Sequence, residues 1–285
     1  MWFVLALVAA ACTAAADVLT KKAAAGRPAH ILALARWLYA LPVLAVLIPF
    51  VETPRLSPKF FGLLAVMVPL EIAAIMLYIR AITTSPLSLS VPFLSFTPAL
   101  LLGTSALFLG ERVPPSGLAG VLLVAFGAYC MNLPDLKKGL LEPFRAILRK
   151  KGPRYMLAVA AIYSVTSALV KFAINETGPY FFSVFYVALL AAVFVPVLAA
   201  AGRPVTPVFA GWRALLPIGI AIGAGTIAQF VSYTMAPVAY AIAVKRLSLV
   251  LGVIAGRVFF GEGGFAERLT GSAMMLAGVA LITLA

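Results

Sequence analysis

Apolar residues occur along this chain in runs of about 20, separated by short connections that hold most of the charged residues. A helix needs about 20 apolar residues to cross a membrane, whereas a barrel strand needs only about 10, in alternation. The pattern therefore predicts an all-α integral membrane protein with ten transmembrane helices. The predicted helices span residues 2–22, 31–51, 60–82, 86–109, 115–133, 154–174, 180–200, 212–234, 237–260 and 267–285.

Composition supports this class and excludes others. The chain is 64% hydrophobic and 11% charged, against about 25% charged residues in an average soluble domain. Because nearly all of it is assigned to the membrane, we expect no soluble catalytic domain and no enzyme activity. The net charge of +13 indicates basic connections that face anionic lipid headgroups, not a nucleic-acid surface. We expect a multi-pass protein of a bacterial inner membrane, as a monomer or homodimer.

The distribution of Lys and Arg predicts the orientation of the chain. Connections after the odd-numbered helices hold fourteen of these residues and connections after the even-numbered helices hold four. The positive-inside rule places the richer connections in the cytoplasm, which puts both termini outside. Segment 2–22 has no basic stretch before it, so we expect a mature helix and not a cleaved signal peptide.

The chain also repeats itself. Residues 108–111 read FLGE and residues 259–262 read FFGE, which is an offset of 151. The same offset places Pro86 on Pro237, Gly120 on Gly271 and Gly127 on Gly278, and an offset of 150 places Lys21 on Lys171. We therefore expect two five-helix repeats, 1–133 and 154–285. Because five is odd, the second repeat must be inverted relative to the first, which is the plan of many secondary transporters.

The connection between the repeats, 134–153, is basic and has two possible interpretations. Leu136, Leu140, Phe144 and Leu148 fall on one helical face, as in a helix that lies along anionic lipid headgroups. Gly139 and Pro143 weaken a continuous helix. A plain linker between the repeats is the alternative.

Residues 78–129 resemble the drug/metabolite transporter superfamily, and specifically its ten-helix EamA-type carriers. The resemblance rests on the run YIRAITTSPLSLSVPFLSFTPALLLGTSALFLGERVPPSGLAGVLLVAFGAY, with its prolines, its LGE turn and its later glycines. The second half has similar runs, RLSLVLGVIAGRVFFGE and RLTGSAMMLAGVALI. The resemblance implies a carrier of small molecules that works by alternating access. It also implies cytoplasmic termini, against the charge distribution.

Two adjacent basic residues, Lys245 and Arg246, lie inside the apolar segment 237–260. A charge at the centre of a membrane helix costs about 3 kcal/mol on insertion scales, so such residues usually face a cavity or a partner. We predict that they contact an anionic substrate group. The pair also resembles the phosphate-binding pair of the sugar-phosphate branch of the superfamily. A structural ion pair with Glu71, or extension to the interface, is the alternative.

The other candidate substrate-binding residues are Glu71, Arg36, Gln229 and Tyr78. Glu71 lies near the middle of segment 60–82, where it could carry a proton or serve as a permanent counter-ion. Arg36 lies in the site or extends to the cytoplasmic surface. Gln229 and Tyr78 lie near helix ends. Other tyrosines, Tyr163, Tyr186, Tyr233 and Tyr240, are expected mainly as interfacial anchors, with stacking walls for a planar substrate as the alternative.

Some charged and proline residues are predicted to be structural. Asp17 and Lys21 have the spacing of an (i, i+4) ion pair. Glu111 and Glu262 each precede a predicted helix, whose N-terminus favours a carboxylate. Pro92 and Pro98 predict a bend in segment 86–109, whereas segment 237–260 is expected to be straighter.

The sequence contains no motif for metal binding, for a catalytic triad or for ATP binding. A single histidine, His30, builds no metal site or catalytic triad, and no phosphate-binding loop for ATP occurs. We therefore expect no cofactor. The predicted function is a secondary transporter, an exporter or exchanger, for a small polar metabolite with an anionic group. Amino acids and drugs are alternative substrates, and a non-transporting component, such as a lipid-carrier flippase subunit or a sensor, is the alternative class.

Overall fold

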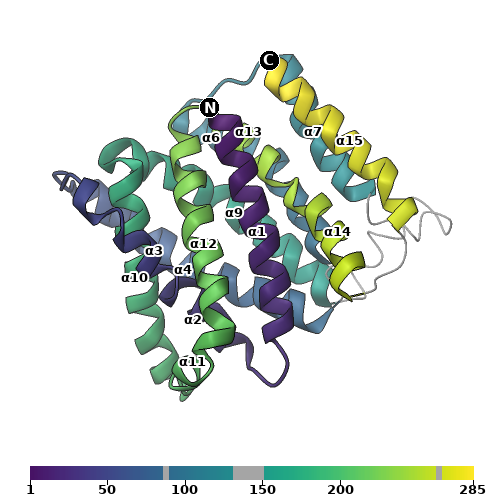
Figure 1. Ribbon diagram of the computed structural model, residues 1–285. Helices are drawn as coiled ribbons and strands as arrows, with labels where there is room; N and C mark the ends of the chain where they lie inside the picture. Colours follow the sequence, from purple (N-terminus) through teal and green to yellow (C-terminus); the bar gives the residue numbers. More distant parts are fainter. Residues whose placement is uncertain (86–89, 131–150, 261–264) are drawn as a thin grey trace.

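The structure, a computed structural model, describes residues 1–85, 90–130, 151–260 and 265–285 (Figure 1). All regular secondary structure in these residues is helical. The helices are α1 (Trp2–Ala23), α2 (Ala29–Leu38), α3 (Leu41–Ala45), η1 (Ile48–Phe50), α4 (Pro58–Thr84), η2 (Val91–Ser95), α6 (Phe96–Leu109), α7 (Pro115–Cys130), α9 (Lys151–Thr177), α10 (Pro179–Ala200), α11 (Pro207–Ala210), α12 (Trp212–Tyr233), α13 (Val238–Lys245), α14 (Ser248–Phe260) and α15 (Phe265–Leu284).

Helices occur in all ten predicted segments. Within the described residues, five of them are long and apolar enough to cross a membrane, namely α1, α4, α9, α10 and α12. The other segments hold shorter or interrupted helices, so the full count of ten spans stays a prediction. Residues 134–150 of the connection between the repeats lie outside the described residues, and so does Glu262. The last residues of the connection, from Lys151 on, form the start of α9.

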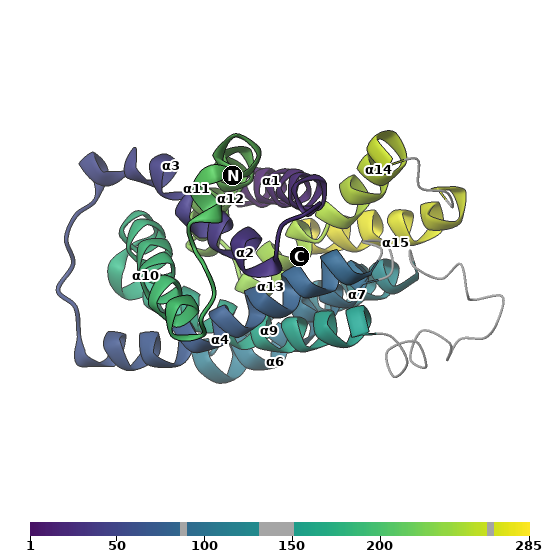
Figure 2. The same cartoon turned by 90° about the horizontal axis from the view of Figure 1, so that it is seen from below.

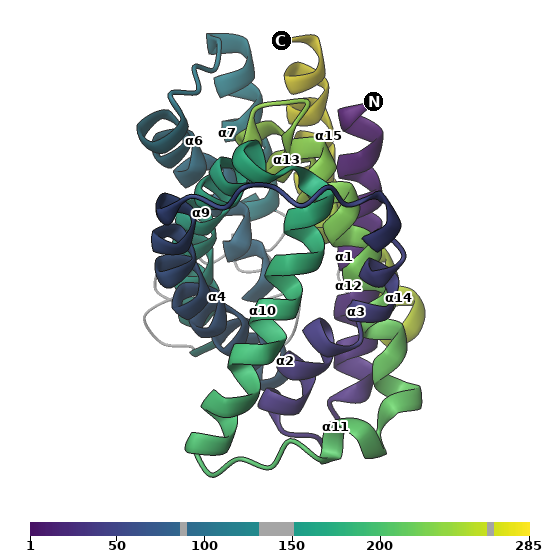
Figure 3. The same ribbon diagram turned by 90° about the vertical axis from the view of Figure 1, so that its left-hand side faces the viewer.

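Both termini lie at one end of the molecule, whereas α11 lies at the opposite end (Figures 1 and 3). This arrangement is the one expected for an even number of crossings. Which end faces the cytoplasm stays a prediction from the charge distribution.

The segment expected to be straight is interrupted. α13 ends at Lys245 and α14 begins at Ser248, so Arg246 and Leu247 separate two helices. No proline causes this break. Non-helical backbone at membrane depth is tolerated where it lines a cavity or is buried in protein, and Arg246 lines a cavity described below. In segment 86–109 the expected irregularity takes the form of the 3₁₀ helix η2, which leads into α6.

The two predicted repeats are interlocked rather than side by side. α1 packs against α12, and the helices at the equivalent repeat positions, α9 and α4, pack against each other. Figure 2 shows α4, α6 and α9 grouped on one side and α1, α12 and α14 on the other. Each of the two repeats thus supplies helices to both groups.

α7 and α15 also occupy equivalent repeat positions, and they lie side by side (Figures 1 and 2). A Cβ atom at Gly120 would lie 2.8 Å from the carbonyl oxygen of Gly278, and one at Gly127 would lie 2.8 Å from that of Gly271. From Gly120 to Gly127 the chain advances seven residues along α7, while the contacted residue on α15 moves back by seven, from Gly278 to Gly271. The two helices are antiparallel, and their contact is self-complementary, as expected for repeats related by a two-fold axis.

We predict that Gly127→Val destabilises the protein. A Cβ atom there would lie 2.7 Å from the backbone nitrogen of Met275, so the helices must separate, at a typical cost of about 1–3 kcal/mol. Thermal unfolding in detergent should show a melting temperature lowered by several degrees. Gly103→Val is the matched control, because a Cβ atom at Gly103 meets nothing within 4 Å. An equal loss in both variants would contradict the proposed packing role.

Candidate functional site

A cavity of about 170 Å³ lies between the two helix groups. All six residues predicted to bind substrate line it. They are Arg36 of α2, Glu71 and Tyr78 of α4, Gln229 of α12, Lys245 of α13, and Arg246 in the break before α14. Residues far apart in the sequence thus meet in one chamber.

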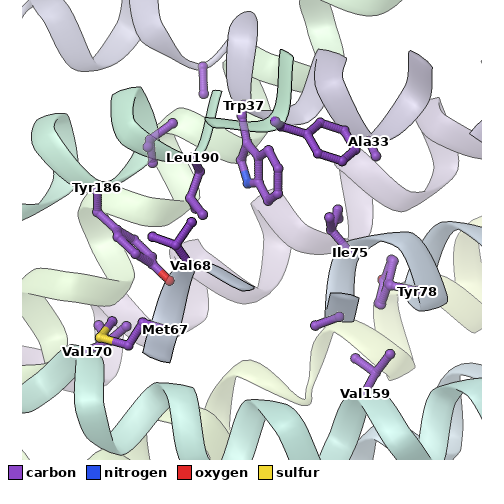
Figure 4. Close-up of a cluster of buried hydrophobic side chains, with 14 of the residues drawn as sticks. Ala33, Trp37, Met67, Val68, Ile75, Tyr78, Val159, Val170, Tyr186 and Leu190 are labelled. Carbon is purple, nitrogen blue, oxygen red and sulfur yellow. The ribbon is translucent and has the colours of Figure 1, made fainter. Parts of the chain in front are cut away.

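The cavity suits a compact ligand. Its volume is below the range of about 300–1,000 Å³ that is typical of sites for drug-sized ligands. Its wall is partly apolar: the residues shared by the apolar core and the cavity lining include Trp37, Ile75, Tyr78, Val170, Tyr186 and Leu190 (Figure 4). Small-molecule sites typically combine such apolar side chains with polar groups that orient the ligand.

Repeat-related positions face each other across the cavity. Five pairs separated by 151 residues have both members in the lining: Arg36 with Val187, Glu71 with Ile222, Ile75 with Thr226, Tyr78 with Gln229, and Leu94 with Lys245. The cavity therefore lies where the two repeats meet. Its charges follow no such symmetry, because the partners of Glu71 and Lys245 are both apolar.

Arg36 is fixed on one wall by a network that the sequence analysis missed. Its Nη1 donates to Asp17 Oδ1 at 3.2 Å and to Thr20 Oγ1 at 3.3 Å. The Tyr78 hydroxyl donates to Asp17 Oδ2 at 2.6 Å. The guanidinium carbon of Arg36 lies 5.2 Å from the centre of the Tyr78 ring, within the range of cation–π attraction.

Two predictions are corrected by this network. Arg36 is only 6% exposed, so it does not extend to a surface. Asp17, assigned from its spacing to a local pair with Lys21, instead holds two residues of the cavity wall. The reason is tertiary: α1, α2 and α4 converge there, and a buried guanidinium requires a counter-charge, which among the described residues Asp17 supplies.

Lys245 is held by a chain of polar side chains. Its ammonium donates to Gln229 Oε1, and Gln229 Nε2 donates to the Tyr233 hydroxyl. Gln229 and Tyr233 lie one helical turn apart on α12, so a single helix face presents both. Lys245 thus has a neutral partner rather than a carboxylate, and its positive charge remains available to a ligand.

Arg246 follows directly and is only 3% exposed. Its Nε has no hydrogen-bond partner among the described residues. Its backbone N–H closes α13, with bonds of 3.1 Å to the carbonyl oxygens of Ile242 and Ala243. A buried guanidinium atom with no protein partner is costly, and a ligand that accepts its hydrogen bond would remove that cost.

Glu71 forms no ion pair with Lys245 or Arg246, although all three side chains belong to the described part of the chain. The ion pair with Glu71, which was the alternative to substrate contact, is therefore absent from this conformation. Glu71 instead shares the cavity wall with the hydroxyl residue Thr166. The cavity consequently presents one carboxylate and two cationic groups that do not neutralise each other by direct contact.

Further lining residues were assigned another role or not recognised in the sequence. Tyr163, Tyr186 and Tyr233 line the cavity with Tyr78, whereas we expected most tyrosines to be interfacial anchors. Thr166 and Ser167 of α9 also line it. No sequence signal distinguishes these hydroxyl residues, because Ser and Thr are common in membrane helices and their direction depends on helix rotation.

Four residues beyond one end of the cavity contact one another, and we call them the end cluster: Glu111, Lys171, Ala236 and Val238. Lys171 donates to the Glu111 carboxylate and, at 2.8 Å, to the carbonyl oxygen of Ala236. Glu111 Oε2 accepts the backbone N–H of Val238 at 3.1 Å. This cluster lies about one helical turn beyond the lining residues Ser167 and Ile242, toward the end that holds the termini.

The end cluster corrects the role assigned to Glu111. Its carboxylate was expected to stabilise the helix that follows it in sequence, which is α7. It instead binds the first residue of α13, from the other repeat. The physical argument, a carboxylate at a helix N-terminus, is the same, but the helix that receives it is brought there by the tertiary fold.

No group of three or more His, Cys, Asp or Glu residues that could hold a metal ion occurs in the described residues. A model of the EamA-like transporter family matches residues 1–133 and 150–284. The chain belongs to the EamA-like transporter family. It is thus a transporter and a multi-pass integral membrane protein, and the family match covers both predicted repeats and omits most of the connection between them.

Two individual proteins are similar to this chain over most of its length. A riboflavin transporter from Brucella anthropi is 25% identical over 275 residues, covering 94% of this chain and 93% of that protein. A protein of known crystal structure matches with a TM-score of 0.74 at 18% identity, covering 99% of this chain and 96% of that chain. The match to the crystal structure shows that this EamA-like transporter shares its fold with that protein.

We predict that Asp17→Asn strongly destabilises this EamA-like transporter. The side chains of Arg36 and Asp17 are 8% and 12% exposed, and removing one partner of a buried ion pair typically costs about 3–5 kcal/mol. Thermal unfolding in detergent measures the loss. The double variant Asp17→Asn, Arg36→Gln removes both charges and should recover part of the stability. A double variant less stable than Asp17→Asn would show that Asp17 does not act by neutralising Arg36.

Proposed function

We propose that this protein is a secondary transporter, an exporter or exchanger, that moves a small polar metabolite with an anionic group. The metabolite occupies the cavity between the repeats, and the two ends of the cavity open alternately. Arg36, Glu71, Tyr78, Gln229, Lys245 and Arg246 form its binding site. The single observation that carries this proposal is Arg246, a buried cation on the cavity wall with an unpartnered Nε.

The balance of charge favours an anionic group over a cationic one. Asp17 neutralises Arg36, and the lining then retains two cations, Lys245 and Arg246, against Glu71 alone. The surplus is positive and lies in a buried site, where electrostatic attraction is much stronger than in water. A carboxylate or phosphate matches the planar donor array of Arg246 and the point charge of Lys245.

A carrier accounts for the cavity better than a static membrane component does. A scaffold would be stabilised by packed apolar side chains between α4, α6, α12 and α13 and by a salt bridge at Glu71. The described residues of α4, α12 and α13 instead line a cavity with several polar side chains, and Glu71 has no ion pair with a described residue. A protein that has no ligand to bind gains nothing from unneutralised buried charges.

A flavin is the second candidate substrate, because the relative from Brucella anthropi is named a riboflavin transporter. Tyr78, Tyr163, Tyr186 and Trp37 provide aromatic walls for a ring system. The size of the cavity weighs against it, since about 170 Å³ is below the roughly 300–1,000 Å³ of typical sites for drug-sized ligands. A three-ring flavin requires a wider state of the cavity than this conformation has.

We predict that protein in liposomes takes up a labelled anionic metabolite without ATP, and that Arg246→Ala abolishes the uptake. L-glutamate, glucose 6-phosphate, flavin mononucleotide and riboflavin are the probes, with the lipophilic cation tetraphenylphosphonium as the opposite charge class. Loss of the Arg246 guanidinium removes the strongest anion-binding group, so transport of the preferred anion should fall to the level of empty liposomes. A thermal-shift screen with the same compounds identifies the preferred probe beforehand.

Arg80→Ala is the matched control. Arg80 is an exposed basic residue on α4, outside the cavity lining, so its removal changes the net charge equally but leaves the site intact. Wild-type rates are expected. Transport of tetraphenylphosphonium alone would overturn the anionic substrate class, and preference for riboflavin over flavin mononucleotide would establish the second candidate.

Alternating access requires that the end cluster break and re-form. It joins Glu111 of the first repeat to Lys171 and to the start of α13 in the second repeat. The side chains of Lys171 and Glu111 are 14% and 13% exposed, so the contact excludes most water. A substrate leaves through this end only when these contacts open, and their strength therefore biases the protein between its two states.

We predict that Glu111→Gln opens this end more often. A cysteine at Ile242, which lines the cavity about one turn from Val238, reports access in a background without Cys12 and Cys130. Its labelling by an impermeant maleimide should accelerate about tenfold, which corresponds to about 1.4 kcal/mol. Glu176→Gln is the control, since Glu176 is an exposed α9 carboxylate that accepts from Ser57 at 3.1 Å. Equal labelling of Glu111→Gln and wild type would contradict a gating role.

A further inference from the structure

Tyr186 of α10 carries a hydroxyl group that no part of the described protein satisfies. The residue is 3% exposed, it lines the cavity, and its Oη has no hydrogen-bond partner among the described residues. Buried tyrosine hydroxyl groups normally find a partner, because an unpaired polar group in an apolar environment is unfavourable. Each such group in a native structure therefore requires an explanation.

The Tyr186 ring is fixed in place. It stacks on Phe182 of the same helix, with ring centres 4.9 Å apart and planes 14° from parallel. Phe182 is fully buried and also contacts Phe60 and Phe230, with ring centres at 6.2 and 5.7 Å. Figure 4 shows Tyr186 among apolar side chains that include Val68 and Leu190. The hydroxyl is thus held by a packed aromatic cluster.

The position of the group distinguishes it from other unpaired hydroxyls. Ser90, Thr97 and Tyr240 also have unpaired hydroxyl oxygens among the described residues, but none of them lines the cavity. Only two of the unpaired atoms in this part of the chain do so, namely Tyr186 Oη and Arg246 Nε. They come from α10 and from the break between α13 and α14, so a single ligand that fills the cavity can reach two separate walls.

We propose that Tyr186 determines substrate specificity by hydrogen-bonding a second polar group of the substrate, while Arg246 binds the anionic group. This inference rests on the proposed function. Arg246 can only donate, and the tyrosine hydroxyl both donates and accepts. The substrate class is therefore a compact anion with a carbonyl, hydroxyl or second carboxylate oxygen at a distance from its anionic group. An anion that lacks this oxygen leaves the Tyr186 hydroxyl unpaired and is disfavoured.

Tyr186→Phe tests the proposal, because it removes only the hydroxyl and keeps the stacked ring. Tyr240→Phe is the matched control, since it removes an equally unpaired hydroxyl outside the cavity. Both variants should unfold, without ligand, at the wild-type temperature or slightly above it, because an unsatisfied buried group is lost. The probes are L-glutamate, glucose 6-phosphate, flavin mononucleotide and riboflavin, and the one that shifts the wild-type melting temperature most is carried forward.

For that probe we expect Tyr186→Phe to raise the apparent KM of transport about 5- to 10-fold, the effect of one lost hydrogen bond. Tyr240→Phe should leave the KM unchanged. An unchanged KM in Tyr186→Phe, or a lower melting temperature of its ligand-free form, would overturn the specificity role, the latter by revealing a structural one. If no probe raises the melting temperature of the wild-type protein and none is transported by it, the proposed function fails, and this inference fails with it.

Discussion

The need to compensate buried charge is the constraint on which the rest of this structure depends. Arg36, Lys245 and Arg246 lie inside a membrane protein, where an isolated cation is costly. The chain resolves each one differently: Asp17 neutralises Arg36, Gln229 accepts from Lys245, and Arg246 keeps an unpartnered Nε. Arg36 is therefore part of the structure of the wall, whereas Lys245 and Arg246 are available to a ligand. It also explains why α13 ends at this point, since a helix break next to a polar cavity costs less than one in lipid.

The cavity exists because the repeats are interlocked. α1 packs on α12 and α4 on α9, so neither repeat completes a core by itself. The self-complementary glycine contact between α7 and α15 adds a tightly packed pair at the edge of this assembly. The helix groups on either side of the cavity therefore combine segments of both repeats. If one group moves against the other, it widens one end of the cavity as it narrows the other, which is the motion that alternating access needs.

The helical segments and the charged residues that line the cavity could be predicted from the sequence, because those features depend on local pattern. Runs of about 20 apolar residues and cations within them indicate a membrane helix and a buried site whatever the tertiary fold. The partners of those residues were missed, since they depend on helix rotation and packing. Asp17 was assigned to Lys21 from spacing alone, Glu111 to α7 instead of α13, and Tyr186 to an interface. The helix break at Arg246 could not be predicted, because no proline lies there.

Several pairs of repeat-related positions line the cavity, whereas its charged groups do not follow the repeat. Tyr78 and Gln229 are repeat-related, as are Leu94 and Lys245, and all four line the cavity. The unpaired Arg246 and Tyr186 both belong to the second repeat. In the proposed cycle the anionic group of the substrate therefore stays on the second repeat whichever end is open. Symmetric packing makes the two open states similar in energy, and asymmetric charges give the substrate one orientation in both. The substrate then crosses by movement of the protein around it, without turning in the site.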